Sequence, residues 1–192
     1  MGQTMDTSEA REHLEIVDRV LAEADRTVYV IGDFFIVWGL ASALLDLIYQ
    51  FRLDGRVGDN AFIVAAIGLA AAIVYTIVRA RGLAANGRRM SRVQRDYVNV
   101  LWVVFGITAI AQIAAYNIFA GWSSAALWTI ASAVVASYVG LHGNRRGIVG
   151  GVVLVASLIV ASSMPHVAGY VLAAGMVIGY AGFGVASLLA RD

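Results

Sequence analysis

The chain has 192 residues, of which 60% are hydrophobic and 14% charged, with a formal net charge of +1. Soluble domains average about 45–50% apolar and about 25% charged residues, so this composition predicts a membrane protein. The near-neutral charge gives no reason to expect nucleic acid as a partner. All 14 basic residues are arginine and no cysteine is present, which excludes lysine Schiff bases, disulfides and thiolate metal sites.

The first 27 residues predict a cytoplasmic amphipathic helix over 6–27. Asp6 suits the N-cap, with Glu9 three positions later. An apolar stripe follows at spacings of three and four: Leu14, Val17, Leu21, Ala24 and Val28. Such a stripe must be buried against the membrane surface, the loops of its own chain or another chain. The other faces are more acidic than basic, unlike interfacial helices, which favours packing against protein.

Six apolar runs follow, each of at least 18 residues, which is enough to cross a hydrocarbon core of about 30 Å. They occupy residues 28–51, 61–78, 97–120, 123–140, 147–164 and 166–190. The runs lack polar–apolar alternation, and a spanning helix satisfies its own backbone hydrogen bonds. The sequence therefore predicts an all-α, polytopic six-helix bundle over residues 28–192.

Arginine placement predicts the orientation. With the N-terminus inside, only Arg52 and Arg56 fall in external loops, and all other arginines fall in cytoplasmic segments. Basic residues concentrate on the cytoplasmic side of membrane proteins. We therefore expect both termini inside. The abundance of Arg, Ala, Gly and Val is typical of bacterial coding, so we expect a multi-pass protein of the bacterial inner membrane.

Two aspartates, Asp33 and Asp46, lie within the first run, where ionisable residues indicate function by default. They are separated by roughly 20 Å along a helix and by about 220° around it, so they form no carboxylate pair. One interpretation is structural, with Asp33 pairing a cytoplasmic arginine such as Arg79 and Asp46 bonding Gln50 or a tyrosine. The alternative is a proton or cation path with both aspartates facing the bundle interior.

Other candidates for a polar site are Gln112 and Asn117 in the third run. They either hydrogen-bond neighbouring helices or line a small pocket with Asp46. Small residues four apart, such as Gly147 and Gly151, predict close helix packing within the chain, or else between copies. The three histidines lie outside the runs and no catalytic or nucleotide motif is present, so we expect no metal site and no cofactor.

The stretch Phe34-Phe35-Ile36-Val37-Trp38-Gly39, preceded by the polar segment Glu12–Arg26, resembles a loose group of uncharacterised six-helix bacterial inner-membrane proteins. The resemblance covers residues 9–45. In this group a short N-terminal helix precedes a first span with an aromatic-aliphatic-Trp-Gly stretch. It implies the same layout here and no particular activity.

These observations favour a non-enzymatic regulatory or scaffold subunit that acts through its cytoplasmic face. The expected contact face comprises Leu14, Val17, Leu21, Arg88, Arg89 and Arg92. Its partner would be a cytoplasmic protein or a second copy of the chain. The alternative is a small transporter or channel for protons, cations or a small solute that uses Asp33 and Asp46.

Overall fold

The computed structural model describes residues 7–85, 92–115, 117–118, 121–142 and 144–189, and side chains at some helical positions, including 19–31, lie outside this description. The described residues are almost entirely helical and contain no strand. Six segments are long and apolar enough to cross a membrane: Gly32–Leu53, Ala61–Gly82, Asp96–Ala114, Trp122–Leu141, Arg146–Ser163 and Pro165–Leu189. The predicted multi-pass, all-α fold is confirmed.

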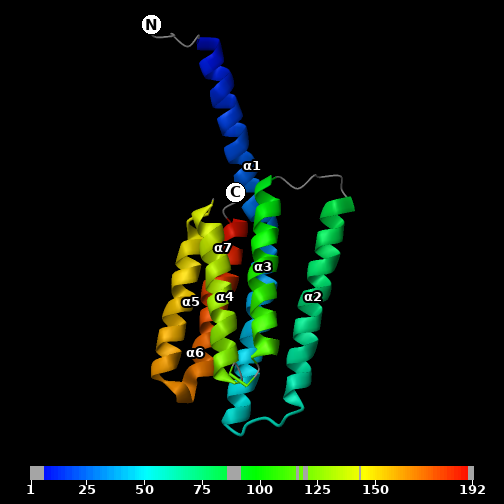
Figure 1. Ribbon diagram of the computed structural model, residues 1–192, viewed down its shortest axis with the longest axis vertical. Coiled ribbons are helices and arrows are strands. Elements are labelled where there is room, and N and C mark those ends of the chain that lie inside the picture. The colour runs from blue at the N-terminus through cyan, green and yellow to red at the C-terminus, as the bar shows by residue number, and fades with distance from the viewer. Residues whose placement is uncertain (1–6, 86–91, 116, 119–120, 143, 190–192) are drawn as a thin grey trace.

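The first helix, α1 (Thr7–Leu53), is continuous over 47 residues. At 1.5 Å per residue it is about 70 Å long, more than twice the thickness of a hydrocarbon core. No glycine or proline lies between residues 7 and 31 to interrupt it. The segment predicted as a cytoplasmic helix therefore continues the first span without a break. We call residues 7–31 the arm; Figure 1 shows it extending well beyond the ends of the other helices.

The next helices run up and down beside α1: α2 (Ala61–Ala85), α3 (Arg92–Ala114), α4 (Trp122–Leu141) and α5 (Arg146–Ser163). The third helix ends earlier than the predicted residue 120, because Ala115 and Ile118 enter a turn in which the Ile118 amide donates to the Ala115 carbonyl at 2.8 Å. The end of α7 lies at the end of the bundle from which the arm emerges (Figure 1).

The sixth span has an irregular middle. It begins with a 3-10 turn, η1 (Pro165–Val167), and continues through α6 (Ala168–Gly175), a π-helical segment, η2 (Met176–Ala181), and α7 (Gly182–Leu189). The wider π turn lies against α1 at Gly39, where an added Cβ would come within 2.8 Å of the Ala181 nitrogen. Only glycine permits this backbone contact, so Gly39 fixes the approach of α1 to the widened turn.

The core lies between α1, α4, α5 and the sixth span. Phe35 of α1 places its ring 4.8 Å from the rings of both Tyr180 and Phe183, edge to face. Leu154 of α5 and Met176 of η2 complete this cluster and are almost fully buried. On α1 the buried residues recur at helical spacing on one inward stripe: Phe35, Gly39, Ala43, Asp46 and Gln50.

The small residues serve packing within the chain, as one of the two interpretations predicted. A Cβ at Gly175 would collide with the Ser157 side chain of α5, and a Cβ at Gly151 would collide with Ser137 of α4. Gly150 and Gly179 face each other with their backbones in contact. In lipid, where helices gain nothing by hiding apolar surface from one another, this close approach supplies much of the cohesion.

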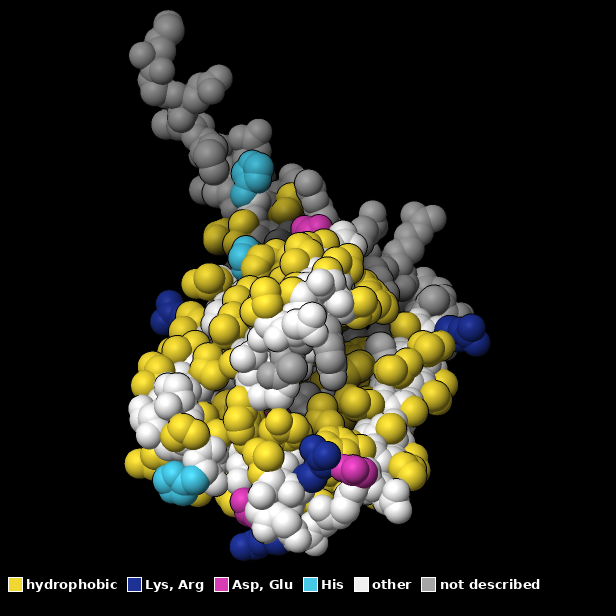
Figure 2. All heavy atoms as spheres, turned by 60° about the horizontal axis from the view of Figure 1, so that its bottom comes forward, with side chains coloured by type: hydrophobic (Ala, Val, Ile, Leu, Met, Phe, Trp, Pro, Cys, Tyr) yellow, Lys and Arg dark blue, Asp and Glu magenta, His cyan; other side chains and the backbone are white. Residues whose placement is uncertain are grey.

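The bundle is unevenly buried. The apolar windows of α2 and α3 are each only 11% buried within the protein, whereas that of the sixth span is 56% buried. On α2 and α3, large apolar side chains are exposed, such as Ile67, Val78, Ile107 and Ile113. Hydrophobic side chains cover much of the face in Figure 2, and the few charged groups lie at its edges and in its lower part. This surface suits a lipid bilayer, and α2 and α3 are its peripheral helices.

Candidate functional site

The carboxylate of Asp33 is fully engaged at the arm end of α1. Its Oδ2 accepts hydrogen bonds from the Tyr75 hydroxyl and from Arg79 Nε, both at 2.8 Å. The backbone amide of Phe34 donates to Oδ1 at 3.0 Å. Tyr75 and Arg79 are four residues apart on α2 and so present both groups on one face. The predicted pairing of Asp33 with Arg79 is confirmed, and it ties α2 to α1.

A shallow hollow of about 250 Å³ lies beside this ion pair, lined by Tyr75, Val78, Arg79 and Gly82. The Arg79 side chain is 45% exposed and its partner Asp33 is 19% exposed. Because the two charges neutralise each other, the hollow offers little net charge for a ligand. The arrangement is that of a helix–helix contact near the membrane boundary.

Asp46 has a different environment. It belongs to the inward stripe of α1 and is 7% exposed. Among the described residues, none donates a hydrogen bond to its carboxylate and no cation lies within ion-pairing distance. The predicted bond from Asp46 to Gln50 is not formed, because the Gln50 amide is bonded to other groups. An aspartate at this position inside a membrane bundle is the most unusual polar group of the described chain.

Gln50 joins α1 to the start of the sixth span. It is 1% exposed. Its Oε1 accepts from the Gly169 amide at 3.0 Å, and its Nε2 donates to the His166 carbonyl at 2.9 Å and to Asp54 Oδ1 at 2.8 Å. The Tyr170 hydroxyl donates to the other Asp54 oxygen at 2.6 Å. We call this set of five residues the clasp.

Ion pairs surround the clasp outside the apolar spans. Arg56 lies 3.8 Å from Asp54, and Arg52 pairs with Asp59. Hydrogen bonds from Tyr170 and Gln50 lower the pKa of Asp54; burial opposes them, and the charge of Arg56 adds a smaller lowering effect. Asp54 is therefore a carboxylate over the ordinary pH range and keeps the clasp closed.

The other predicted site residues, Gln112 and Asn117, do not line a common pocket with Asp46. Two hollows lie on the described part of the protein, and none of these three residues lines either of them. Gln112 is half-buried on α3, which contacts α1 only weakly. Asn117 is exposed in the turn after α3 and does not lie in the span. Thr108 is buried on α3, but its hydroxyl donates to the Val104 carbonyl of its own helix at 2.8 Å.

The expected contact face is only partly described. Leu14 and Val17 lie on the arm with exposed fractions of 62% and 51%. Arg88 and Arg89 fall outside the described residues, as do the side chains of Leu21 and Arg92. Every described side chain between Arg11 and Asp18 is exposed, so none of them is buried against another described element of the chain.

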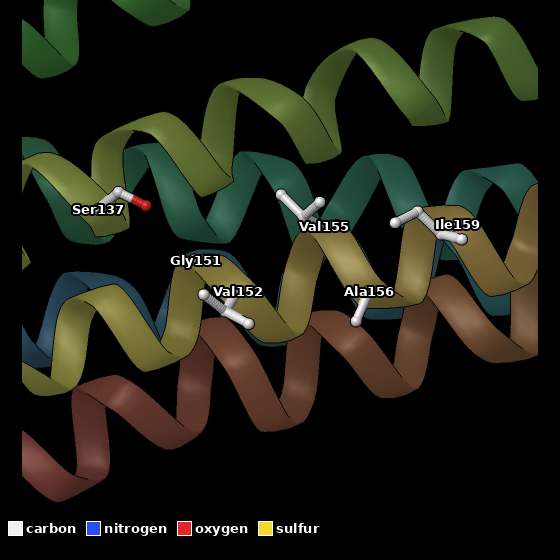
Figure 3. A pocket seen from close by; sticks show the side chains of 6 residues that line it. All are labelled: Ser137, Gly151, Val152, Val155, Ala156 and Ile159. Carbon is white, nitrogen blue, oxygen red and sulfur yellow. The ribbon is translucent and has the colours of Figure 1, made fainter.

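A second hollow runs along the outside of α4 and α5, with a volume of about 290 Å³. Its lining is apolar apart from Ser137 of α4, and the rest comes from α5: Gly151, Val152, Val155, Ala156 and Ile159 (Figure 3). No titratable side chain lines it, so it offers packing surface and no acid–base chemistry. In the described residues no group of three or more His, Asp or Glu side chains is placed to hold a metal ion.

Sequence reasoning missed the clasp. Spacing contained the signal, because Phe35, Gly39, Ala43, Asp46 and Gln50 follow each other at three and four residues and so share one face. The partners of Gln50 are 116 and 119 residues away, however, and no local pattern pairs them. The spacing of four residues between Tyr75 and Arg79 on α2 likewise indicated that both could reach Asp33, although only Arg79 was predicted as its partner.

Comparisons with protein-family models, with curated proteins and with solved structures find no match to this chain.

Proposed function

We propose that the protein is a non-enzymatic regulatory or scaffold subunit of the bacterial inner membrane, with both termini in the cytoplasm, whose arm binds a cytoplasmic protein. The occupant of the apolar stripe is a basic amphipathic helix of that protein. The observation that carries the proposal is the exposure of Leu14 and Val17 on a helix that runs straight on from a membrane span. The group resemblance of residues 9–45 fits the same layout.

The orientation rests on the arginines that lie at the two ends of the bundle. The end of the bundle from which the arm emerges carries Arg79 and Arg81, near the end of α2, and Arg145 and Arg146, at the start of α5. The turn between α1 and α2 at the other end carries Arg52 and Arg56, and both are paired with aspartates. At the arm end Arg79 pairs with Asp33, but Arg81, Arg145 and Arg146 have no aspartate partner among the described residues, and this excess of positive charge supports a cytoplasmic arm.

Two of the three surfaces that could cover the stripe conflict with the geometry. An interfacial helix lies in the plane of the membrane, whereas the arm continues the axis of a transmembrane helix without a break. The described loops of the same chain leave Leu14 and Val17 uncovered as well, since both side chains are exposed. A second protein is the remaining way to bury Leu14 and Val17.

Charge indicates the chemistry of that protein. Residues 6–27 contain seven acidic residues and three arginines. Opposite charges across an interface steer association and suppress wrong partners. A helix that offers an apolar stripe flanked by basic residues would therefore match the arm in both respects.

The proposal is tested by photo-crosslinking in native membranes. A photoreactive amino acid is placed in the full-length chain at Leu14, at Val17 or, as a matched control, at Ile16, which is also exposed but lies off the stripe. We expect the same protein to be captured from positions 14 and 17 and not from 16, with the adduct mapping to a basic helix. The double variant Leu14→Asp/Val17→Asp should abolish the capture of this protein from a photoreactive amino acid at position 10, and Ile16→Asp should not.

Three results would overturn the proposal. Equal capture from all three positions would show a non-specific collision. Adducts to lipid would place the arm on the membrane surface. Adducts only to a second copy of the chain would make the stripe a self-association surface.

The transporter alternative now depends on Asp46 alone. Asp33 is neutralised by Arg79 and bonded by Tyr75, so it has no free capacity to carry a cation. Asp46 is buried on the inward stripe without such a partner, and that observation favours a proton-linked role over a role for both aspartates. Flux into proteoliposomes that Asp46→Asn removes and Asp33→Asn leaves unchanged would support it.

A further inference from the structure

We propose that Asp46 is a proton-binding site: its side chain is held as the neutral carboxylic acid inside the bundle, and it exchanges its proton when α1 and α6 separate at the clasp. The inference concerns the membrane bundle and does not rest on the binding of a partner by the arm.

Burial makes the charged form of Asp46 costly. The residue is 7% exposed and lies on the same stripe as Phe35 and Ala43, which are part of the apolar core. Moving an isolated carboxylate from water into an apolar medium costs tens of kcal/mol in the limiting case, and such groups become neutral instead. Asp46 has no compensating donor among the described residues, so neutralisation by a proton is the least costly state.

No counter-charge is free to replace the proton. The charged and titratable groups bordering this part of α1 in the described residues lie towards its outer end: Tyr49, Arg52, Asp54, Arg56, Asp59, His166 and Tyr170. Both arginines in this set are already paired with aspartates, Arg52 with Asp59 and Arg56 with Asp54. The described residues of α4 next to Trp122 bring no charge to the site.

The described residues around Asp46 offer too few ligands for a metal cation. A Cβ at Gly169 of α6 would come within 2.8 Å of the backbone carbonyl oxygen of Asp46, 2.7 Å of the Trp122 ring and 2.5 Å of Gln50 Cβ. A bound cation such as Ca²⁺ or Mg²⁺ needs about six oxygen ligands, and Asp46 is the single carboxylate at this position. A proton needs neither space nor further ligands.

The clasp controls when the proton can leave. Ionisation breaks the O–H bond, leaves the electron pair on the carboxylate oxygen and passes the proton to water, so water must reach Asp46. Its path from the outer end is closed by Gln50, which bridges α1 to the Gly169 amide and the His166 carbonyl. Proton release is therefore linked to opening of the contact between α1 and α6.

Infrared spectroscopy of the full-length protein in lipid tests the protonation state. At about pH 7, where an ordinary aspartate is ionised, we expect a carbonyl band of a neutral acid that shifts in D₂O. The band should vanish in Asp46→Asn, move in Asp46→Glu and persist in Asp33→Asn and Asp54→Asn. Absence of the band in the wild type, or its loss in Asp33→Asn with retention in Asp46→Asn, would overturn the proposal.

The link to the clasp is tested by the rate of deuterium exchange at the same band. Gln50→Ala should accelerate exchange at least tenfold. The control is Trp38→Phe, which removes a bond between α1 and α2 at the other side of α1 and should leave the rate unchanged. Equal rates in the wild type and Gln50→Ala would show that the clasp does not gate the site. If Asp46→Asn fails to fold, the band shift in Asp46→Glu alone makes the assignment.

Discussion

The surroundings of Asp33 and Asp46 differ although both residues lie on one helix. Asp33 lies near the boundary of the apolar span, accepts two hydrogen bonds from α2 and is neutralised by Arg79. Asp46 points into the bundle and meets no donor among the described residues. Asp33 is the second residue of the span Gly32–Leu53, whereas Asp46 lies seven residues inside its other end, and the two side chains also point in different directions around the helix. Depth in the span and direction around the helix therefore together decide whether a polar residue fastens two helices or remains isolated.

The two regions also differ in tightness. Around Asp46 the backbones of α1 and α6 approach so closely that Gly169 has no space for a methyl group. Around Asp33, α2 is a peripheral helix that packs mainly on α1. Polar bonds hold the loose contact, and close packing together with the hydrogen bonds of Gln50 holds the tight one. The following predictions test this contrast.

The largest effect is expected from Gly169→Ala, which attacks the tight contact. The added methyl would lie 2.7 Å from the Trp122 ring, and overpacking of this kind costs about 1–3 kcal/mol. We expect the free energy of unfolding in mixed micelles to fall by about 3 kcal/mol. Gly106→Ala on α3, where nothing lies within 4 Å of the new methyl, should change it by less than about 0.5 kcal/mol. Equal losses in both variants would contradict the contrast.

Arg79→Ala should have the next largest effect, because it removes the counter-charge of Asp33 and leaves this carboxylate without a cation, as Asp46 is. The remaining carboxylate is only 19% exposed and keeps one side-chain donor, Tyr75. Removing one member of a fully buried pair costs about 3–5 kcal/mol, and exposure of Arg79 reduces this to about 2 kcal/mol. Arg81→Ala, on the exposed side of the same helix, is the control.

A second substitution checks the cause of that loss. The loss in Arg79→Ala is measured as the free energy of unfolding in mixed micelles. If the cost comes from an uncompensated charge, adding Asp33→Asn to Arg79→Ala should recover most of the lost stability. Failure to recover would assign the loss to packing of the arginine stem.

Trp38→Phe tests a weaker bond between the same two helices. The Trp38 indole donates to the Thr76 hydroxyl at 3.0 Å, and phenylalanine removes the donor while keeping most of the ring. Side-chain hydrogen bonds between membrane helices contribute about 0.6 kcal/mol on average, and we expect a loss of that size. Trp102→Phe, at a 67% exposed position on α3, should lose less. Thermal unfolding in nanodiscs measures the difference.

The smallest effect concerns Asp54, at the surface above Asp46. Hydrogen bonds from Tyr170 and Gln50 lower the pKa of Asp54 in the folded protein below its unfolded value of about 3.9. Its contribution to stability is therefore complete above about pH 4 and is lost as the pH falls through the folded pKa. Unfolding measured from about pH 3 to pH 7 should show this acid-side loss in the wild type and in Asp59→Asn, and less of it in Asp54→Asn.

The spans were predictable because each is a local property of about 20 residues. Five of the six predicted runs lie close to the observed helices, and the third was placed too long because Asn117 and Ile118 were included in an apolar run that turns before them. Length and hydropathy do not register such a turn. The pairing of Asp33 with Arg79 was also predictable, from their similar depth on two neighbouring spans.

The clasp and the isolation of Asp46 were beyond prediction for a physical reason. Both depend on which residues of the sixth span meet α1, and Gln50 lies 119 residues before its partner Gly169. Periodicity tells which face of α1 is buried, but it does not tell which helix covers that face. The π segment at Met176–Ala181 adds a further shift in register that no spacing rule anticipates.

The unbroken length of α1 has a mechanical consequence. A rod with no hinge between Leu14 and Gln50 transmits its tilt along its whole length. From Gln50 to Thr7 the helix covers about 65 Å at 1.5 Å per residue, so a tilt of about 10° about Gln50 moves its tip by about 11 Å. The contact of α1 with α6 is the fulcrum of this lever, and small changes there become large displacements at the far end of the arm.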